Sequence, residues 1–240
     1  MKNLQQLEEQ EERSILTAPL QRRSFLQFAG AGMAGAALLA AGCTKDDGIV
    51  AAPSTGVTLD FKDDFGVLNY AYALEQLEAA FYIQVASNIP SSFSQAERVY
   101  FQDIQFHEIA HREFLKKALG SNAIGALEVN FSSINFTDRT AILGAAKAFE
   151  DLGVAAYNGA GKRIKSATYL ELAGKIVSVE ARHAAYIREL VTPGTSFADL
   201  TSLSALGSNA AGGLDAALTP DKVLPIAGAY VKTKINVINL

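Results

Sequence analysis

The stretches that decide the fold are two short steps, Glu108-Ile-Ala-His111 and Glu180-Ala-Arg-His183, each set in an apolar helical pattern. Residues three apart stand one turn above each other on a helix, so each step directs a carboxylate and an imidazole toward one point. One further glutamate lies upstream of each step, in matching frames. Two such steps and two single glutamates form the ligand set of a carboxylate-bridged dinuclear metal site in a four-helix bundle.

The helical region consists of two halves that repeat. From Glu75 to Glu150 is 75 positions, and from the first glutamate–histidine step to the second is 72. Glu75 and Glu150 share the frame Glu-x-Leu-x-x-Ala-x-Tyr, which ends in Tyr82 and Tyr157. A helix pair repeated about a two-fold axis places two equivalent half-sites face to face. The two tyrosines are expected either to hydrogen-bond the carboxylates or to fill the core.

The candidate ligands occupy apolar faces. A carboxylate in such a face costs several kcal/mol to bury without a partner. Four carboxylates facing one core would repel one another unless cations or protons compensated them, and two divalent metals supply that compensation. Carboxylates and imidazoles without a thiolate favour two iron or two manganese ions. The predicted metal ligands are Glu75, Glu108, His111, Glu150, Glu180 and His183.

Three polar residues near these ligands are left out of the set. Glu78 lies one turn beyond Glu75, but its counterpart in the repeat is Gly153, so Glu75 is preferred. Asp151 is offset by about 100° from the residue before it, and is expected to face solvent. His107 is likewise off the face, and is expected at the surface or beside a ligand.

Four long helices are predicted, at about 64–87, 94–119, 138–158 and 168–191. Asp63 or Asp64 can cap the first, and Ser94-Gln-Ala-Glu97 is a capping box that opens the second. Thr168 is the candidate start of the fourth. The residues after about 195 form a tail, in which Pro220 occupies the first position of a short helix.

The segment 120–137 decides how the helices connect, because it is long and has no helical pattern. An extended chain covers up to about 3.3 Å per residue, so this segment can return along the whole bundle. A long crossover between the second and third helices is the ferritin-like arrangement. The sequence therefore predicts an all-α, ferritin-like four-helix bundle at 63–194, followed by a C-terminal tail at 195–240.

Residues 1–43 resemble an export signal. The stretch around Arg22 and Arg23 resembles a twin-arginine motif, and Leu39-Ala-Ala-Gly-Cys43 resembles a lipoprotein processing site. A transmembrane anchor is the alternative, but the small residues and the closing cysteine disfavour it. We expect the twin-arginine export machinery as a partner and a membrane anchor through lipidated Cys43.

The residues after the cysteine point to the envelope. Thr44-Lys-Asp-Asp47 is similar to acidic signals for the cell surface, although a solvated linker would look the same. The expected location is therefore periplasmic or outer-membrane, with surface exposure open. Residues 44–62 read as a flexible tether. The net charge is −4 and basic residues are scattered, which argues against nucleic acid as a partner. Monomer and homodimer both stay open.

Three stretches, 68–82, 149–157 and 179–188, resemble a family of secreted bacterial ferritin-like domain proteins. That family is similar to plant desiccation-related proteins, which share endings like 218–227. The resemblance covers about 62–232, and the stretch around Glu180 and His183 is its most specific part. It implies a four-helix ferritin-like fold with a di-iron or di-manganese centre.

The sequence indicates two alternative functions. Bridging glutamates would hold two metals close enough to act together, so the first is redox chemistry on O2 or H2O2 in envelope stress protection. The second is a non-catalytic stress-protective or envelope-binding lipoprotein, with a structural metal or none.

Overall fold

The structure is a computed structural model that describes residues 56–194 and 197–240. The expected export signal, with Arg22, Arg23 and Cys43, lies outside the described residues, and so does most of the expected tether. Within the described part of the chain, no helix has both the length and the hydrophobicity needed to cross a membrane.

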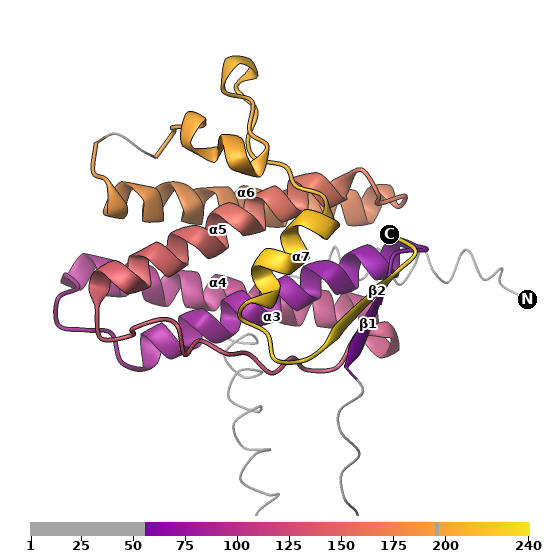
Figure 1. Cartoon of the computed structure of the whole chain (residues 1–240), viewed down its shortest axis with the longest axis horizontal. Coiled ribbons are helices and arrows are strands. Elements are labelled where there is room, and N and C mark those ends of the chain that lie inside the picture. The colour runs from indigo at the N-terminus through magenta and orange to yellow at the C-terminus, as the bar shows by residue number, and fades with distance from the viewer. Residues whose placement is uncertain (1–55, 195–196) are drawn as a thin grey trace, which may run out of the picture. The chain divides into compact units, whose positions relative to one another are not determined.

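Four helices form the bundle: α3 (Asp64–Ser87), α4 (Gln95–Leu119), α5 (Arg139–Gly161) and α6 (Ala167–Val191). α3 packs along α4, α5 packs along α6, and the two pairs lie against each other (Figure 1). Each helix contributes a fully buried apolar side chain to the core, namely Phe81, Phe101, Ile142 and Ile187. The predicted all-α four-helix bundle is confirmed.

The starts of the first two bundle helices follow the capping chemistry of the sequence. The Asp63 side chain accepts a hydrogen bond from the backbone N–H of Gly66, and so caps α3. Ser94 and Glu97 form the predicted capping box at the start of α4. These bonds satisfy N–H groups that have no partner within the helix, which fixes where each helix begins.

The start of α6 differs from the prediction. α6 is capped by Ser166 rather than Thr168, because the Ser166 side chain accepts from the N–H of Tyr169. Asp64, the other candidate cap of α3, accepts instead from the backbone N–H groups of Lys165 and Ser166, at 2.8 Å each. This contact between the starts of α3 and α6 occupies the Asp64 carboxylate, so Asp63 is the residue that caps α3.

Residues 120–137 return along α3, as the predicted crossover requires. Three contacts follow one another in the same order on both segments: Asn69 with Ile124, Gln76 with Leu127, and Phe81 with Phe131. The first two are hydrogen bonds from backbone N–H groups to buried side-chain oxygens, at 2.8 and 2.9 Å. The long crossover between α4 and α5 is confirmed, and it is held by specific polar anchors.

The C-terminal segment covers one side of the bundle. The predicted short helix is α7 (Pro220–Gly228), with proline in its first turn, and it lies across α5 and α3 (Figure 1). β2 (Ile235–Ile238) pairs in parallel with β1 (Val57–Asp60), so the two ends of the described chain meet. Residues 57–60 were expected to belong to a tether, and that interpretation was wrong. Their partner lies at the far end of the chain, where a local pattern cannot reveal it.

α5 is longer than predicted, and the reason is again a contact with residues that are distant in the sequence. Gly159 was interpreted as the start of a helix end, yet the helix continues to Gly161. A Cβ atom at Gly159 would lie 1.8 Å from the carbonyl oxygen of Leu218, whose N–H binds the carbonyl oxygen of Ala155. The glycine thus provides room for the backbone that leads into α7.

Candidate metal centre

The six predicted ligands come together in the core, and every helix of the bundle contributes at least one. The four glutamates are fully buried, although carboxylates are almost never fully buried unless they are paired. The two histidines are nearly as enclosed. α3 provides Glu75, α4 provides Glu108 and His111, α5 provides Glu150, and α6 provides Glu180 and His183.

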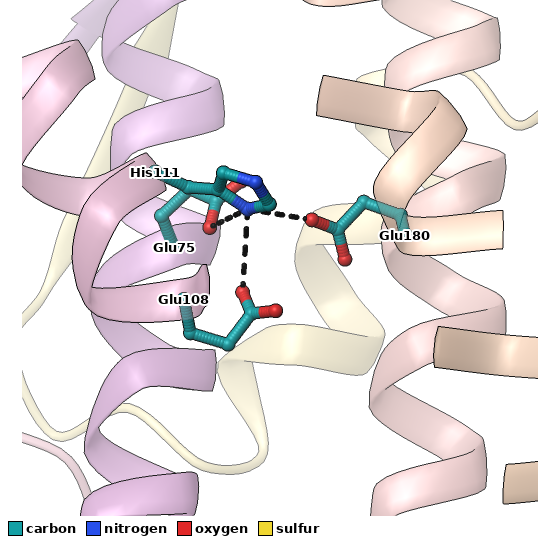
Figure 2. Close-up of side chains that lie close together, drawn as sticks. All are labelled: Glu75, Glu108, His111 and Glu180. Atoms are coloured by element: carbon teal, nitrogen blue, oxygen red, sulfur yellow. Dashed lines mark ion pairs between the residues drawn. The ribbon is translucent and has the colours of Figure 1, made fainter. Parts of the chain in front are cut away.

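The first half-site is centred on His111 (Figure 2). Its Nδ1 atom lies 2.8 Å from Glu180, 3.5 Å from Glu75 and 3.8 Å from Glu108. The three carboxylates approach this nitrogen from three different helices, so the site depends on the whole bundle.

The second half-site is centred on His183. Its Nδ1 atom lies 3.0 Å from Glu108, 3.4 Å from Glu150 and 3.9 Å from Glu180. Glu108 turns Oε1 toward His183 and Oε2 toward His111, and Glu180 likewise divides its two oxygens between the histidines. Glu108 and Glu180 therefore lie between the half-sites, whereas Glu75 and Glu150 each serve one.

The two half-sites have equivalent contacts, because corresponding residues of the two halves of the repeat make corresponding hydrogen bonds. Tyr157 donates a hydrogen bond to Glu75 at 2.5 Å, and Tyr82 donates one to Glu150. Both tyrosines are buried, so each binds a carboxylate and fills the core at once. Each tyrosine reaches the glutamate of the opposite half, which ties the two helix pairs together at the site.

The cluster fits a pair of cations. Glu75, Glu150 and both histidines have one buried atom each without a hydrogen bond in the described chain, and Glu108 and Glu180 have two each. The short nitrogen–oxygen distances thus lack hydrogen-bond alignment, as expected for atoms that converge on common points. They form two groups of one imidazole and three carboxylates, in each of which one ligand atom per residue lies within 4.8 Å of the others. Each group could hold a metal ion.

The charges explain why a cation would be favourable here. Burial and the neighbouring carboxylates raise the pKa of Glu180 well above its usual range, and burial raises the pKa of Glu75 to about 7. Burial opposes protonation of His183, but Glu150 and Glu108 outweigh it and raise the pKa of this imidazole to about 10. Protons therefore offset the buried charge when no metal is bound, and a metal would replace them.

Asp151 is not where it was expected. It is buried rather than solvated, and it accepts hydrogen bonds from Arg188 and Lys147 at 2.8 Å each. It does lie outside both ligand groups. The prediction failed for a physical reason. The angular offset from Glu150 directs the Asp151 side chain away from the site, but α6 covers that side of α5, so the side chain does not reach solvent. Arg188, on the facing helix, was the feature of the sequence that could have indicated a buried partner for Asp151.

Glu78 also lies outside the two ligand groups, but it is buried close to them. One of its oxygens lies 3.0 Å from the place where a Cβ atom of Gly153 would be. Burial and the surrounding glutamates raise the pKa of Glu78 well above its usual range, which favours the protonated form of this carboxyl. The lack of a side chain at its counterpart in the repeat is what makes space for it.

His107 touches the site from outside. It is exposed, and its Nδ1 lies 2.9 Å from Nε2 of His183, with the two rings stacked. The nitrogen of His183 that faces away from the carboxylates therefore has a partner. The sequence allowed His107 either a surface position or a place beside a ligand, and the structure gives it both.

Comparison with known proteins supports the fold. A family model described as a ferritin-like domain matches residues 63–193, a range that contains all six clustered residues and both tyrosines. A search of curated proteins found no match for the chain.

Proposed function

Because this chain belongs to the ferritin-like domain family, we propose that its bundle holds a carboxylate-bridged pair of iron or manganese ions that reacts with H2O2 or O2. The observation that carries the proposal is the division of the Glu108 and Glu180 oxygens between the two histidines. Ions held by these two shared carboxylates would supply redox chemistry on a small oxidant.

The residues have distinct parts in holding such a pair. Glu75 and His111 would bind one ion and Glu150 and His183 the other, with Glu108 and Glu180 shared. The bound pair would supply redox chemistry that no side chain of the cluster has by itself. Tyr157 and Tyr82 fix the two unshared glutamates by hydrogen bonds, and so set where each carboxylate oxygen points.

For the cellular setting we propose an exported lipoprotein that protects the envelope against oxidative stress. The support is in the sequence, where Arg22 and Arg23 lie in a twin-arginine-like motif and Cys43 follows a lipoprotein-like processing site. A lipid anchor would keep the bundle at the periplasmic face of a membrane or at the cell surface. Peroxide removal there needs no second large substrate.

The deciding experiment compares two variants of one helix. Glu108→Gln changes a carboxylate shared by both half-sites, whereas Glu113→Gln makes the same change at an exposed position of α4. Protein purified without added metal would be analysed for metal, and then loaded with Fe(II) or Mn(II). We expect about two ions per chain in the parent protein and in Glu113→Gln, and weaker binding in Glu108→Gln.

Consumption of H2O2 and of O2 by the loaded proteins then separates the two candidate functions. Faster loss of H2O2 over many turnovers in the parent protein and Glu113→Gln than in Glu108→Gln supports redox catalysis, because two molecules of H2O2 can give O2 and two molecules of water without a further reductant. Uptake of O2 by the Fe(II)-loaded protein reports a single oxidation of the bound iron, which is itself the reductant. Binding without either reaction would favour the non-catalytic lipoprotein with a structural metal. If neither metal binds, the cluster is held by protons and hydrogen bonds alone, and the metal proposal is wrong.

A further inference from the structure

An apolar cavity of about 30 Å³ lies between the four helices, next to the His111 half-site. Leu115, one turn beyond His111, and Ile176, one turn before Glu180, both line it. Tyr157 lines it too, and the hydroxyl of this tyrosine binds Glu75. The cavity thus ends against a residue that holds a candidate metal ligand.

The lining of the cavity changes from the surface inward. Ile164, Tyr169 and Leu172 are partly exposed, whereas Leu74 and Tyr157 are buried. The cavity therefore extends from the outer layer of the bundle, at the α6 start, to the neighbourhood of the site.

The repeat shows that the cavity is specific to one half of the molecule. Ala156 and Ala173 line it, and their counterparts 75 and 72 positions earlier are Phe81 and Phe101. Both phenylalanines are fully buried, and Phe101 packs against Tyr82, the counterpart of Tyr157. The space that two aromatic rings fill beside one half-site is thus left open by two alanines beside the other.

We propose that this cavity binds dioxygen, or another apolar molecule of its size, next to the His111 half-site. An apolar cavity stays dry and takes apolar guests, because a water molecule needs two to four polar partners. Hydrogen peroxide has the same requirement, since an unpaired hydroxyl is costly to bury.

Xenon tests the binding site without reference to any metal. We would record xenon binding by xenon-129 NMR and in xenon-pressurised crystals of the metal-free protein. One site is expected in the cavity of the parent protein, and its loss in Ala173→Phe. Ser178→Phe, which adds the same ring at an exposed position of α6, should retain the site. Ala156→Leu fills the cavity from α5 and provides a second test if Ala173→Phe does not fold.

The consequence for reactivity rests on the proposed function and is measured separately. In the Fe(II)-loaded protein, Ala173→Phe should slow the reaction with O2 but leave the reaction with H2O2 unchanged, while Ser178→Phe should change neither. Absence of xenon from the parent protein overturns the inference even if the metal reacts. A xenon site in a protein whose metal reacts with neither oxidant would instead refute the proposed function alone. Equal O2 rates in Ala173→Phe and the parent would show that the cavity does not serve the site.

Discussion

Glu108 and Glu180 owe their position between the two half-sites to the histidine that follows each of them by one turn. Each carboxylate lies beside its own histidine, at 3.8 or 3.9 Å, and closer to the histidine of the facing pair, at 3.0 or 2.8 Å. Glu75 and Glu150 come from helices without a histidine in this position, so each reaches one imidazole only. The position between the half-sites thus follows from having one imidazole on the same helix and one across the bundle.

His107 makes the two half-sites unequal at the residue scale. It contacts His183, and the residue at the corresponding position of the repeat is Val179, which offers no hydrogen bond. A partner on the outer nitrogen of a metal-bound histidine typically changes metal affinity by about 10–100-fold when removed. We predict that His107→Ala weakens binding of one ion of the pair by roughly this factor and leaves the other unchanged.

Titration with Mn(II) followed by calorimetry would measure both affinities. Gln105→Ala provides a control two residues away on α4, outside both ligand groups. Equal weakening of both ions in His107→Ala would contradict the assignment of His107 to the His183 half-site.

At the scale of elements, the crossover is secured by polar contacts of α3. The buried Gln76 side chain accepts a hydrogen bond from the backbone N–H of Leu127 at 2.9 Å. Removal of one partner from a buried hydrogen bond costs about 1–3 kcal/mol. Gln76→Ala should therefore lower the free energy of unfolding by about this amount.

Chemical denaturation of the metal-free protein would measure this loss. The matched control is Gln84→Ala, the same substitution at an exposed position of α3. The control should stay within about 0.5 kcal/mol of the parent protein. A similar result for Gln76→Ala would mean that the crossover is held by its apolar contacts, such as those of Phe131 and Phe136 with Phe81.

At the scale of the whole molecule, the buried charges make stability depend on pH. The folded pKa of Glu75 is raised from 4.5 to about 7, and that of His183 from 6.5 to about 10. A raised folded pKa gives stability that is present below the unfolded value and is lost as pH rises through the folded value. Glu180 acts in the same direction. The pKa of Glu108 is lowered, so the stability that this group contributes is lost only as pH falls below 4.5.

We therefore predict that the melting temperature of the metal-free protein falls between about pH 5 and pH 9. Excess Mn(II) should remove this fall, because metal binding improves as its ligands lose protons. At a hundredfold excess over the dissociation constant, the metal adds about 2.7 kcal/mol of stability. Thermal melts with a chelator and with metal would measure both effects. A melting temperature that rises toward pH 9 without metal would show that the cluster is not held by protons.

The export of the whole molecule is a prediction from the sequence. Replacement of both Arg22 and Arg23 by lysine should leave the precursor in the cytoplasm, because paired arginines are what a twin-arginine signal presents to its machinery. Cell fractionation would show where the protein is, and Cys43→Ser should separately abolish lipid labelling. Unchanged export of the double-lysine variant would mean that a different route is used.

Local physical chemistry is why the sequence alone could predict so much. Helical spacing places Glu180 and His183 on one face whatever surrounds them, and an apolar face directs both inward. The four helices and the crossover follow from such near-neighbour patterns. The choice of Glu75 over Glu78 follows from a comparison of the two halves of the repeat, and the structure brings together the six residues that were selected.

Tertiary structure decided whatever depends on residues that are distant in the sequence. Only the packing of α6 against α5 buries Asp151 on Arg188, and only the return of the C-terminus gives residues 57–60 a partner strand. The division of the glutamate oxygens between two histidines and the contact of His107 with His183 arise across the bundle. A sequence pattern fixes the direction in which a side chain leaves its helix, but what that side chain meets depends on how the helices are brought together.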